Sequence, residues 1–263
     1  MNIPKANLGY GPKNGINSKI PDKKIIIFSG AGISQPSGIK TFRDLDGLWE
    51  NYDIQEICHE RTWKKNFTLV HHFYNQRRKQ LKDVVPNIAH ETVKQIVDKY
   101  GEENVYNITQ NVDDLFERAG IQALHLHGDL TKMHCLACGN KWIIGYEEFN
   151  VDSDKCPFCN SLKAVKPDIV FFEESAPMYN YMYRAFDYAH NPDTIVVVIG
   201  TMGNVIPIVG LLDKKPCKTI LCNMEPSKDL SEKYFDKIYY ESIVTAIAKI
   251  EKDIDKYWNV PIH

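Results

Sequence analysis

Two pairs of cysteines have the spacing of a tetrahedral metal site. Cys135 and Cys138 form one Cys-x-x-Cys pair, and Cys156 and Cys159 form a second pair shortly after it. Each pair can present two thiolates to one Zn²⁺ ion, and the segment 139–155 is long enough to bring the pairs together. Two redox-active dithiols or plain buried cysteines are the alternatives. Because duplicated spacing rarely arises from packing alone, the sequence predicts a structural zinc site.

Short polar motifs follow the predicted strands at the points where those strands end. Open α/β sheets bind ligands at the carboxyl ends of their strands, so we expect the motifs to converge on one crevice. The motifs are Thr41-Phe42-Arg43 beyond the first strand and its turn, Thr109 to Asp113, Leu126-His127-Gly128, Gly200-Thr201, and Asn223-Met224-Glu225.

A glycine-rich turn, Gly30-Ala31-Gly32, directly follows the first predicted strand. Backbone N–H groups in such a turn can approach a pyrophosphate at a helix N-terminus. The third glycine of the dinucleotide fingerprint is displaced to Gly38, and the next strand does not end in a suitable acidic residue. The turn alone is therefore weak evidence, and the pattern disfavours an ordinary dehydrogenase.

Alternating strands and helices predict a parallel, doubly wound α/β sheet of the Rossmann type. Apolar residues at helical spacing occur in 88–100, 178–189 and 242–258. The first predicted strand is a continuous apolar run, as expected when both faces of a sheet are covered, and similar short apolar strands follow it. The predicted strands are Lys24–Phe28, Val105–Ile108, Ala123–Leu126, Ile195–Ile199, Thr219–Cys222 and Lys237–Tyr240.

Two segments without predicted strands interrupt this alternation. Residues 39–84 have a helical and aromatic pattern, and residues 132–166 hold the four cysteines among Gly, Pro and Asp. We expect a helical module and a zinc-binding module that meet as a smaller lobe. The other predicted parts are a flexible N-terminal arm, 1–22, and a Rossmann-like nucleotide-binding domain made of 23–38, 85–131 and 167–263.

Composition restricts the class of protein. The chain has 263 residues, 43% of them hydrophobic, which suffices for one large domain with a smaller lobe. The net charge of -2 provides no basic surface for nucleic acid, and no apolar run is long enough to span a membrane.

The N-terminus lacks targeting patterns, and Cys58, Cys217 and Cys222 lack disulfide spacing, so we expect a cytoplasmic protein. The oligomeric state stays open, and a monomer is compatible with the sequence.

In their order and spacing, these motifs resemble those of the sirtuins, which are NAD-dependent protein-lysine deacylases. The resemblance covers about residues 20–250. It implies acyl-lysine proteins or peptides as substrates, NAD as co-substrate, and nicotinamide and O-acyl-ADP-ribose as products. The matching motifs are Gly30-Ala31-Gly32-Ile33-Ser34, Gly38-Ile39 with Phe42-Arg43, Gln110-Asn111-Val112-Asp113, His127-Gly128, the four cysteines, and Asn223 with Glu225.

The resemblance also implies roles for individual residues. His127 would act as general base on a ribose hydroxyl, for which an imidazole pKa is suited; a purely structural histidine is the alternative. Asn111 would position ribose or water, and Asp113 would hold the nicotinamide carboxamide. Phe42 would shield the ribose, and Arg43 would lie by the phosphates. The other implied nucleotide contacts are Gly30, Ala31, Gly32, Ile33, Gln110, Gly200, Thr201, Asn223, Glu225 and Ile243.

Tyr74 and Arg77 lie three residues apart on a predicted helix, so they share a face and can point into one pocket. A guanidinium suits a carboxylate, and a phenol supplies a second donor. The pair is similar to the one with which class III sirtuins hold the acid end of succinyl-, malonyl- or glutaryl-lysine. An exposed basic helix face that includes Arg78 and Lys79 is the alternative. The sequence favours removal of acidic acyl groups with some deacetylase activity.

The chain departs from the usual sirtuin pattern at Phe116, Asp129, Met202 and Glu173. Glu173 replaces a habitual glycine beside the segment 169–172, where it could crowd an extended substrate peptide or repel an acidic acyl group. His125 has no role in the family pattern, although alternation predicts that it shares one side of its strand with His127. The departures leave two alternatives. One is an NAD glycohydrolase or ADP-ribosyltransferase that uses the same cleft, and the other is a non-catalytic NAD-binding protein.

Overall fold

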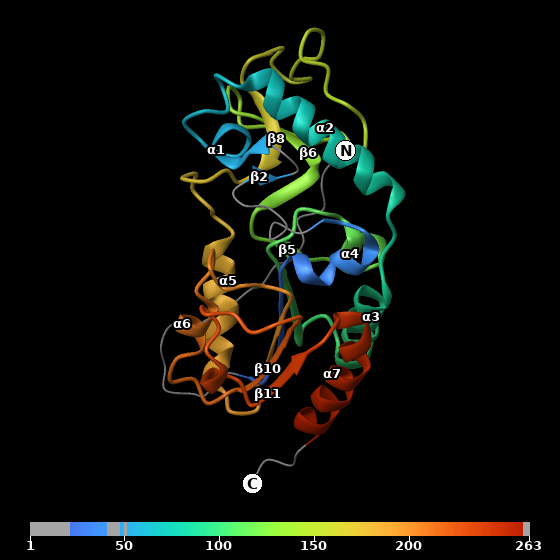
Figure 1. Cartoon of the computed structure of the whole chain (residues 1–263), viewed down its shortest axis with the longest axis vertical. Helices are drawn as coiled ribbons and strands as arrows, with labels where there is room; N and C mark the ends of the chain where they lie inside the picture. The colour runs from blue at the N-terminus through green and yellow to red at the C-terminus, as the bar shows by residue number, and fades with distance from the viewer. Residues whose placement is uncertain (1–21, 41–47, 50–51, 260–263) are drawn as a thin grey trace.

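The computed structural model describes residues 22–40, 48–49 and 52–259 (Figure 1). Most of the predicted N-terminal arm lies outside the described residues. Phe42 and Arg43, both predicted nucleotide contacts, also lie outside them.

A six-stranded parallel sheet forms the larger part of the protein, as predicted. The chain enters at the centre of the sheet, adds two strands on one side, and then adds three on the other, so the order is β11-β10-β9-β1-β4-β5. The winding direction therefore reverses beside β1, at the switch point where doubly wound sheets bind ligands. The strands are β1 (Ile25–Ser29), β4 (Val105–Thr109), β5 (Leu124–His125), β9 (Ile195–Ile199), β10 (Lys218–Asn223) and β11 (Lys237–Tyr240).

Helices cover both faces of this sheet (Figure 1). Alternate residues of β1 divide between the two cores: Ile25 and Ile27 pack toward α3 (Ile88–Tyr100) and α7 (Ile243–Trp258). The intervening Ile26 and Phe28 pack toward the opposite layer. That layer contains α5 (Tyr179–Phe186), η3 (Asp187–His190), α6 (Ile208–Leu212) and η4 (Glu232–Tyr234). Among the described helices, none is both long and apolar enough to cross a bilayer.

The glycine turn does not lead into an α-helix. Two short 3₁₀ turns follow it, η1 (Ala31–Ile33) and η2 (Gln35–Ser37). Pro36 lies in the first turn of η2 and lacks a backbone donor, and Gly38 ends η2 with a φ of 98°. The sequence predicted a helix N-terminus at this position. The chain instead turns away at Gly38, before an α-helix can form.

A smaller lobe contains a three-stranded antiparallel sheet of order β7-β6-β8 (Figure 1). Its strands cross the predicted module limits at 131/132 and 166/167. Strands were not expected in 39–84 or 132–166, and that expectation was wrong. Several of these strands have only two or three residues, too few for an alternating pattern to be recognised. The elements of this lobe are β2 (Leu48–Trp49), β3 (Tyr52–Asp53), α1 (Ile54–Ile57), α2 (Phe67–Asp83), β6 (Gly128–Cys135), β7 (Lys141–Ile143) and β8 (Val165–Ile169).

The helical and cysteine-containing segments share one core, as expected of a single lobe. Phe73 and Tyr74 of α2 are fully buried in the same apolar cluster as Met133 and Cys135 of β6 and Cys156. The remaining short helix, α4 (Leu115–Arg118), follows β4 at the junction of the two parts. Residues from the sheet edge and from α2 are thus held next to each other.

Candidate active site and metal centre

The glycine turn after β1 packs directly against the turn after β9. The Gly30 N–H donates to the Ile199 carbonyl and the Gly32 N–H to the Gly200 carbonyl, both at 2.9 Å. A Cβ atom on Gly32 would come within 2.5 Å of the Gly200 Cα, and Gly200 has a φ of 61°. Only glycine satisfies both requirements without displacing the backbone. The two turns form a close backbone surface at the switch point of the sheet.

Side chains that follow three different strands are joined by hydrogen bonds at this edge. The Gln110 side-chain amide donates to the Thr201 hydroxyl at 3.0 Å, and the Asn223 amide donates to the Thr201 carbonyl at 2.8 Å. Three of the predicted nucleotide contacts therefore lie together, two just after β4 and β9 and one, Asn223, at the end of β10.

Asn111 and Asp113 are buried just beyond β4. The Asn111 amide donates to the Gly30 carbonyl at 3.2 Å and to the Ser34 hydroxyl at 3.0 Å, which ties it to the glycine turn. The Asp113 carboxylate accepts from the Leu115 N–H at 3.2 Å. Burial, opposed by a hydrogen bond with Ser34, raises the pKa of Asp113 to about 6.

His127 lies between the end of β5 and the start of β6, with both ring nitrogens engaged. Nδ1 is 3.0 Å from the Gln110 carbonyl oxygen, and Nε2 is 2.9 Å from the Tyr179 hydroxyl. A carbonyl can only accept, so Nδ1 carries the proton and the Nε2 lone pair accepts from Tyr179. Burial, opposed by the Gln110 contact, lowers the pKa of His127 below 6.5. The ring is therefore neutral at pH 7, the form that a general base requires.

Tyr74 and Arg77 line the same pocket as Val112 and Asp113. Both α2 side chains are buried, which contradicts the exposed-face alternative for Arg77. The pocket has a volume of about 70 Å³. That is roughly the space of two water molecules. Burial and the neighbouring Cys58 thiol raise the pKa of Tyr74, so its hydroxyl keeps the proton that it could donate.

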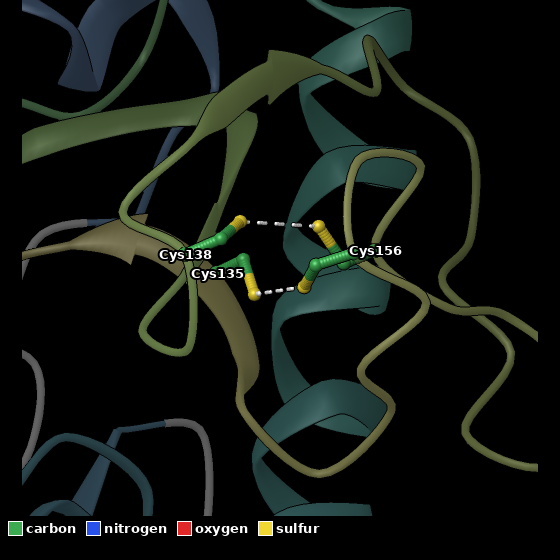
Figure 2. Close-up of side chains that lie close together, drawn as sticks. Cys135, Cys138 and Cys156 are labelled. Carbon is green, nitrogen blue, oxygen red and sulfur yellow. Dashed lines mark hydrogen bonds between the residues drawn. The ribbon is translucent and has the colours of Figure 1, made fainter.

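The four cysteines form a compact sulfur cluster (Figure 2). Their Sγ atoms all lie within 4.8 Å of one another. Cys135 and Cys159 are 3.6 Å apart, and Cys138 and Cys156 are 3.7 Å apart. Zn–S bonds of about 2.3 Å place tetrahedral ligands about 3.8 Å apart, so the cluster fits Zn²⁺. Four protein ligands leave no position for substrate, and the metal would be structural.

The sequence model of the Sir2 family matches residues 30–207, which is more than half of the chain. The chain belongs to the Sir2 family.

Relatives and solved structures agree with this assignment. An NAD-dependent protein deacylase of Campylobacter jejuni is 47% identical over 89% of this chain and 97% of its own. One from Helicobacter hepaticus is 41% identical over 89% and 98%. A Sir2 homologue solved with ADP-ribose has a TM-score of 0.76 at 27% identity, covering 92% of this chain and 95% of its own. A Sir2 homologue–NAD complex has a TM-score of 0.75 at 26% identity, covering 95% and 99%.

The remaining predicted nucleotide contacts of this Sir2 protein differ in exposure. Ile33 and Ile243 are buried in the apolar cluster beneath the site, so they can offer only backbone groups. Ala31 is partly exposed, and Glu225 is exposed two residues beyond β10. The predicted nucleotide contacts therefore include exposed residues as well as residues of the hydrophobic core.

Three of the departures from the sirtuin pattern make local structural contacts. Phe116 is buried and packs edge-on against His90, with ring centroids 4.9 Å apart. Asp129 accepts from the Thr131 N–H at 2.8 Å. The Met202 carbonyl accepts from the Ser227 hydroxyl at 2.7 Å, which joins the loops after β9 and β10.

Glu173 has a left-handed backbone conformation that glycine adopts most readily. Its φ is 68°, a left-handed value that is uncommon for residues other than glycine. Its carboxylate lies 2.6 Å from Nε of Arg61 and 3.6 Å from His59. The glutamate is thus turned toward the Arg61 guanidinium, which partly balances its charge.

Three residues near the site were missed or left without a role by sequence reasoning. Tyr179 contacts His127 from α5, more than fifty positions away in sequence, so spacing gives no signal for it. Ser34 holds Asn111 and was visible only as part of the glycine-rich motif. His125 was expected on one strand with His127, but β5 ends at His125 and the two rings have different partners.

Proposed function

We propose that this Sir2-family protein removes acidic acyl groups, and also acetyl groups, from lysines of proteins, with release of nicotinamide and O-acyl-ADP-ribose. The observation that supports the acidic preference is the pocket that both Arg77 and Tyr74 line. The broader activity, NAD-dependent protein deacylation, follows from family membership and from relatives of that name.

Arg77 supplies the charge for the proposed acyl preference. Arg77 and Tyr74 are one helical turn apart on α2 and face one pocket, so a guanidinium and a phenol can both donate to one carboxylate. The Arg77 guanidinium lies over the Phe73 ring, 5.1 Å from its centroid, which limits its movement. Glu173 would oppose an acidic substrate less than an isolated carboxylate would, because Arg61 is adjacent to it.

The polar side chains at the sheet edge have distinct proposed tasks. The acyl oxygen of the modified lysine would bond to a ribose carbon of NAD as the bond from that carbon to nicotinamide breaks. Nε2 of the neutral His127 would accept a proton from a ribose hydroxyl, while the Gln110 carbonyl fixes the ring through Nδ1. Asn111 would position ribose or water, and Asp113 would accept from the carboxamide of nicotinamide.

An acyl series tests the proposal directly. Replacing Arg77 with methionine should lower kcat/KM for succinyl- and glutaryl-lysine peptides about 10- to 100-fold, because a charge-assisted hydrogen bond is lost. Activity on acetyl-lysine should change less than about threefold. The matched control is Lys79→Met, an exposed position on the same helix, which should leave all three activities unchanged. An equal loss on every peptide, or no loss, would contradict the acid pocket.

NAD consumption with and without peptide separates the alternative functions. A deacylase consumes NAD only with acyl-peptide and forms O-acyl-ADP-ribose. A glycohydrolase consumes NAD alone, an ADP-ribosyltransferase labels an acceptor, and a binding protein does none of these. Turnover of NAD that acyl-peptide does not stimulate would exclude the proposed reaction.

The Tyr179 hydroxyl is hydrogen-bonded to Nε2 of His127, the atom that would accept the proton in the proposed reaction. A ribose hydroxyl must displace the Tyr179 hydroxyl from Nε2, so Tyr179→Phe should raise kcat/KM by roughly 2- to 10-fold, the equivalent of one net hydrogen bond. Initial rates with acyl-peptide measure this. Tyr183→Phe, an exposed tyrosine on the same helix, is the control. A decrease in the Tyr179 variant alone would mean that its hydroxyl assists the reaction.

We further propose that the protein works in the cytoplasm on acyl-lysine proteins. None of the seven cysteines forms a disulfide in the structure, which suits a reducing compartment. Neither a nucleic acid nor a membrane is needed for the proposed reaction.

A further inference from the structure

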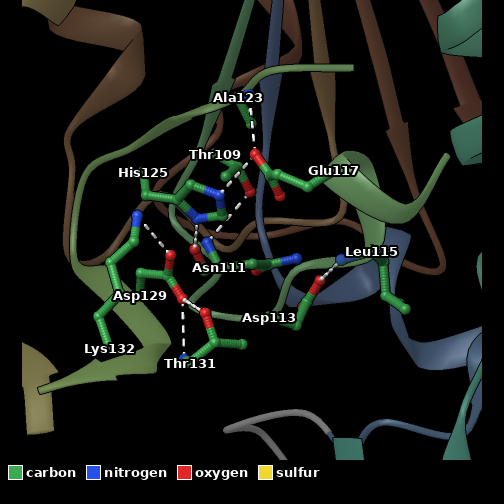
Figure 3. A network of polar contacts seen from close by, with 10 residues as sticks. All are labelled: Thr109, Asn111, Asp113, Leu115, Glu117, Ala123, His125, Asp129, Thr131 and Lys132. Atoms are coloured by element: carbon green, nitrogen blue, oxygen red, sulfur yellow. Dashed lines mark hydrogen bonds and ion pairs between the residues drawn. The ribbon is translucent and has the colours of Figure 1, made fainter. Parts of the chain in front are cut away.

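His125 bridges the active-site loop and α4 (Figure 3). Its Nδ1 lies 2.7 Å from the Asn111 carbonyl oxygen, and its Nε2 lies 3.2 Å from Oε1 of Glu117. The side chain is 13% exposed, so water contributes little to its solvation. The ring therefore connects the backbone of a proposed catalytic residue to a fixed carboxylate.

The two contacts define the protonation of the His125 ring. A carbonyl oxygen can only accept, so Nδ1 carries a proton. Oε1 of Glu117 already accepts from the Ala123 N–H at 3.0 Å, and it accepts from Nε2 as well. Both nitrogens are therefore donors and the ring is an imidazolium. Burial alone lowers the pKa of His125, but the hydrogen bond and charge of Glu117, followed by the Asn111 carbonyl and Asp129, raise it to about 9.

The charged groups around the ring are consistent with a buried cation. Glu117 faces it from α4, Asp129 from β6, and Asp113 from the loop after β4. The Asp129 carboxylate also pairs with Nζ of Lys132 at 2.8 Å. Figure 3 shows His125 among these groups. Burial raises the pKa of Asp113, and the charge of His125 opposes this increase. Burial also tends to raise the pKa of Asp129, but Lys132 and Thr131 lower it overall, and the charge of His125 adds to their effect.

The same loop is fixed on its other side by the glycine turn. The Asn111 N–H donates to the Thr109 hydroxyl at 3.1 Å, and the Asn111 amide donates to Gly30 and Ser34. His125 supplies the remaining anchor, on the Asn111 carbonyl. Without the His125 contact, Asn111 would keep its side-chain hydrogen bonds to Gly30 and Ser34. The peptide plane that contains the Asn111 carbonyl would no longer be restrained.

We propose that His125 is a positively charged positioning residue that aligns Asn111 for the reaction by holding its carbonyl against Glu117 of α4. The inference rests on the proposed deacylase function and adds a residue that does not touch the substrate. Misplacement of a catalytic group by about 1 Å can cost on the order of 100-fold in rate. The effect should therefore appear in kcat more than in KM.

Two substitutions separate the two contacts of the ring. In His125→Asn the amide nitrogen comes near the place of Nδ1 and can still donate to Asn111, whereas in His125→Gln it comes near Nε2 and can still donate to Glu117. We expect His125→Gln to lower kcat about tenfold or more. His125→Asn should keep kcat within about threefold of wild type, and KM for NAD should change little in both. Equal kcat losses in the two variants, or none in His125→Gln, would overturn the proposal.

The wild-type protein provides a test that needs no variant. Nitrogen NMR of the histidine rings should show two protonated nitrogens for His125 at pH 7.5 and loss of one near pH 9. Over the same range kcat should fall, and this alkaline decrease should be absent in His125→Asn. One protonated nitrogen at pH 7.5 would overturn the proposal. Absence of acyl-peptide turnover in the wild type would instead contradict the proposed function, because the ring spectrum does not depend on it.

Discussion

Replacing His127 with asparagine is expected to reduce deacylation of acyl-peptide about 10²- to 10⁴-fold, the usual contribution of a general base. Asparagine can still donate to the Gln110 carbonyl near the place of Nδ1, so the local backbone should stay in position. It cannot accept a proton at the place of Nε2. The deacylated peptide is quantified by chromatography at saturating NAD, and thermal unfolding checks that the fold is intact.

His190→Asn is the matched control for this experiment. His190 is exposed on η3 and contacts Lys215, so the same chemical change should leave turnover unaltered. The pH profile gives a second check. Because the pKa of His127 is lowered below 6.5, kcat/KM in the wild type should stay level down to about pH 6.5 and decrease as His127 becomes protonated below it. Substantial turnover by a folded His127→Asn protein would remove the assignment of the base.

Loss of one zinc ligand is expected to abolish activity and to destabilise the smaller lobe. Structural zinc sites bind with about 10–16 kcal/mol of free energy in peptides, which is coupled to folding. Cys135→Ser should therefore lose the metal and lower Tm by roughly 10 °C or more. Cys135 and Cys156 share an apolar cluster with Phe73 and Tyr74, so the acyl pocket should be lost together with the metal.

Cys217→Ser is the control, since Cys217 is a buried thiol outside the cluster of four. Elemental analysis should give one zinc ion per chain in the wild type and in this control, and almost none in Cys135→Ser. A strong chelator added to the wild type should produce the same loss of activity, and added zinc should restore it. Full activity in a metal-free protein would contradict a structural role.

The larger sheet could be predicted because the same pattern, a short apolar strand, recurs along the sequence. Ile195–Ile199 and Lys237–Tyr240 are observed with the predicted limits, and Val105–Thr109 extends the prediction by one residue. β9 is a continuous apolar run that is buried on both faces, and polar motifs directly follow β4 and β9. The carboxyl-edge rule predicts that Gln110, Thr201 and Asn223 lie close together, and Gln110 and Asn223 each form a hydrogen bond with Thr201.

The strands of the smaller lobe were harder to predict because their pairing depends on contacts between segments that are distant in the sequence. β7 is three residues long with an exposed–intermediate–exposed pattern, and its pairing with β6 cannot be recognised from so short a run. The same limit applies to side-chain partners. The contact of Tyr179 with His127 and the pairing of Glu173 with Arg61 depend on how α5 and α1 meet the sheet, which no local pattern encodes.

The central place of β1 has a consequence for how the protein folds during its synthesis. Ile25 pairs with Val105 on one side and with Ile195 on the other, so the first strand made must wait for partners 80 and 170 residues later. At about 5–20 residues per second, the second neighbour appears on the order of ten to thirty seconds after β1. The apolar strand has two open edges until β4 is made, and one open edge until β9 is made. Folding in the cell should therefore depend on protection of residues 25–29 from other chains while translation continues.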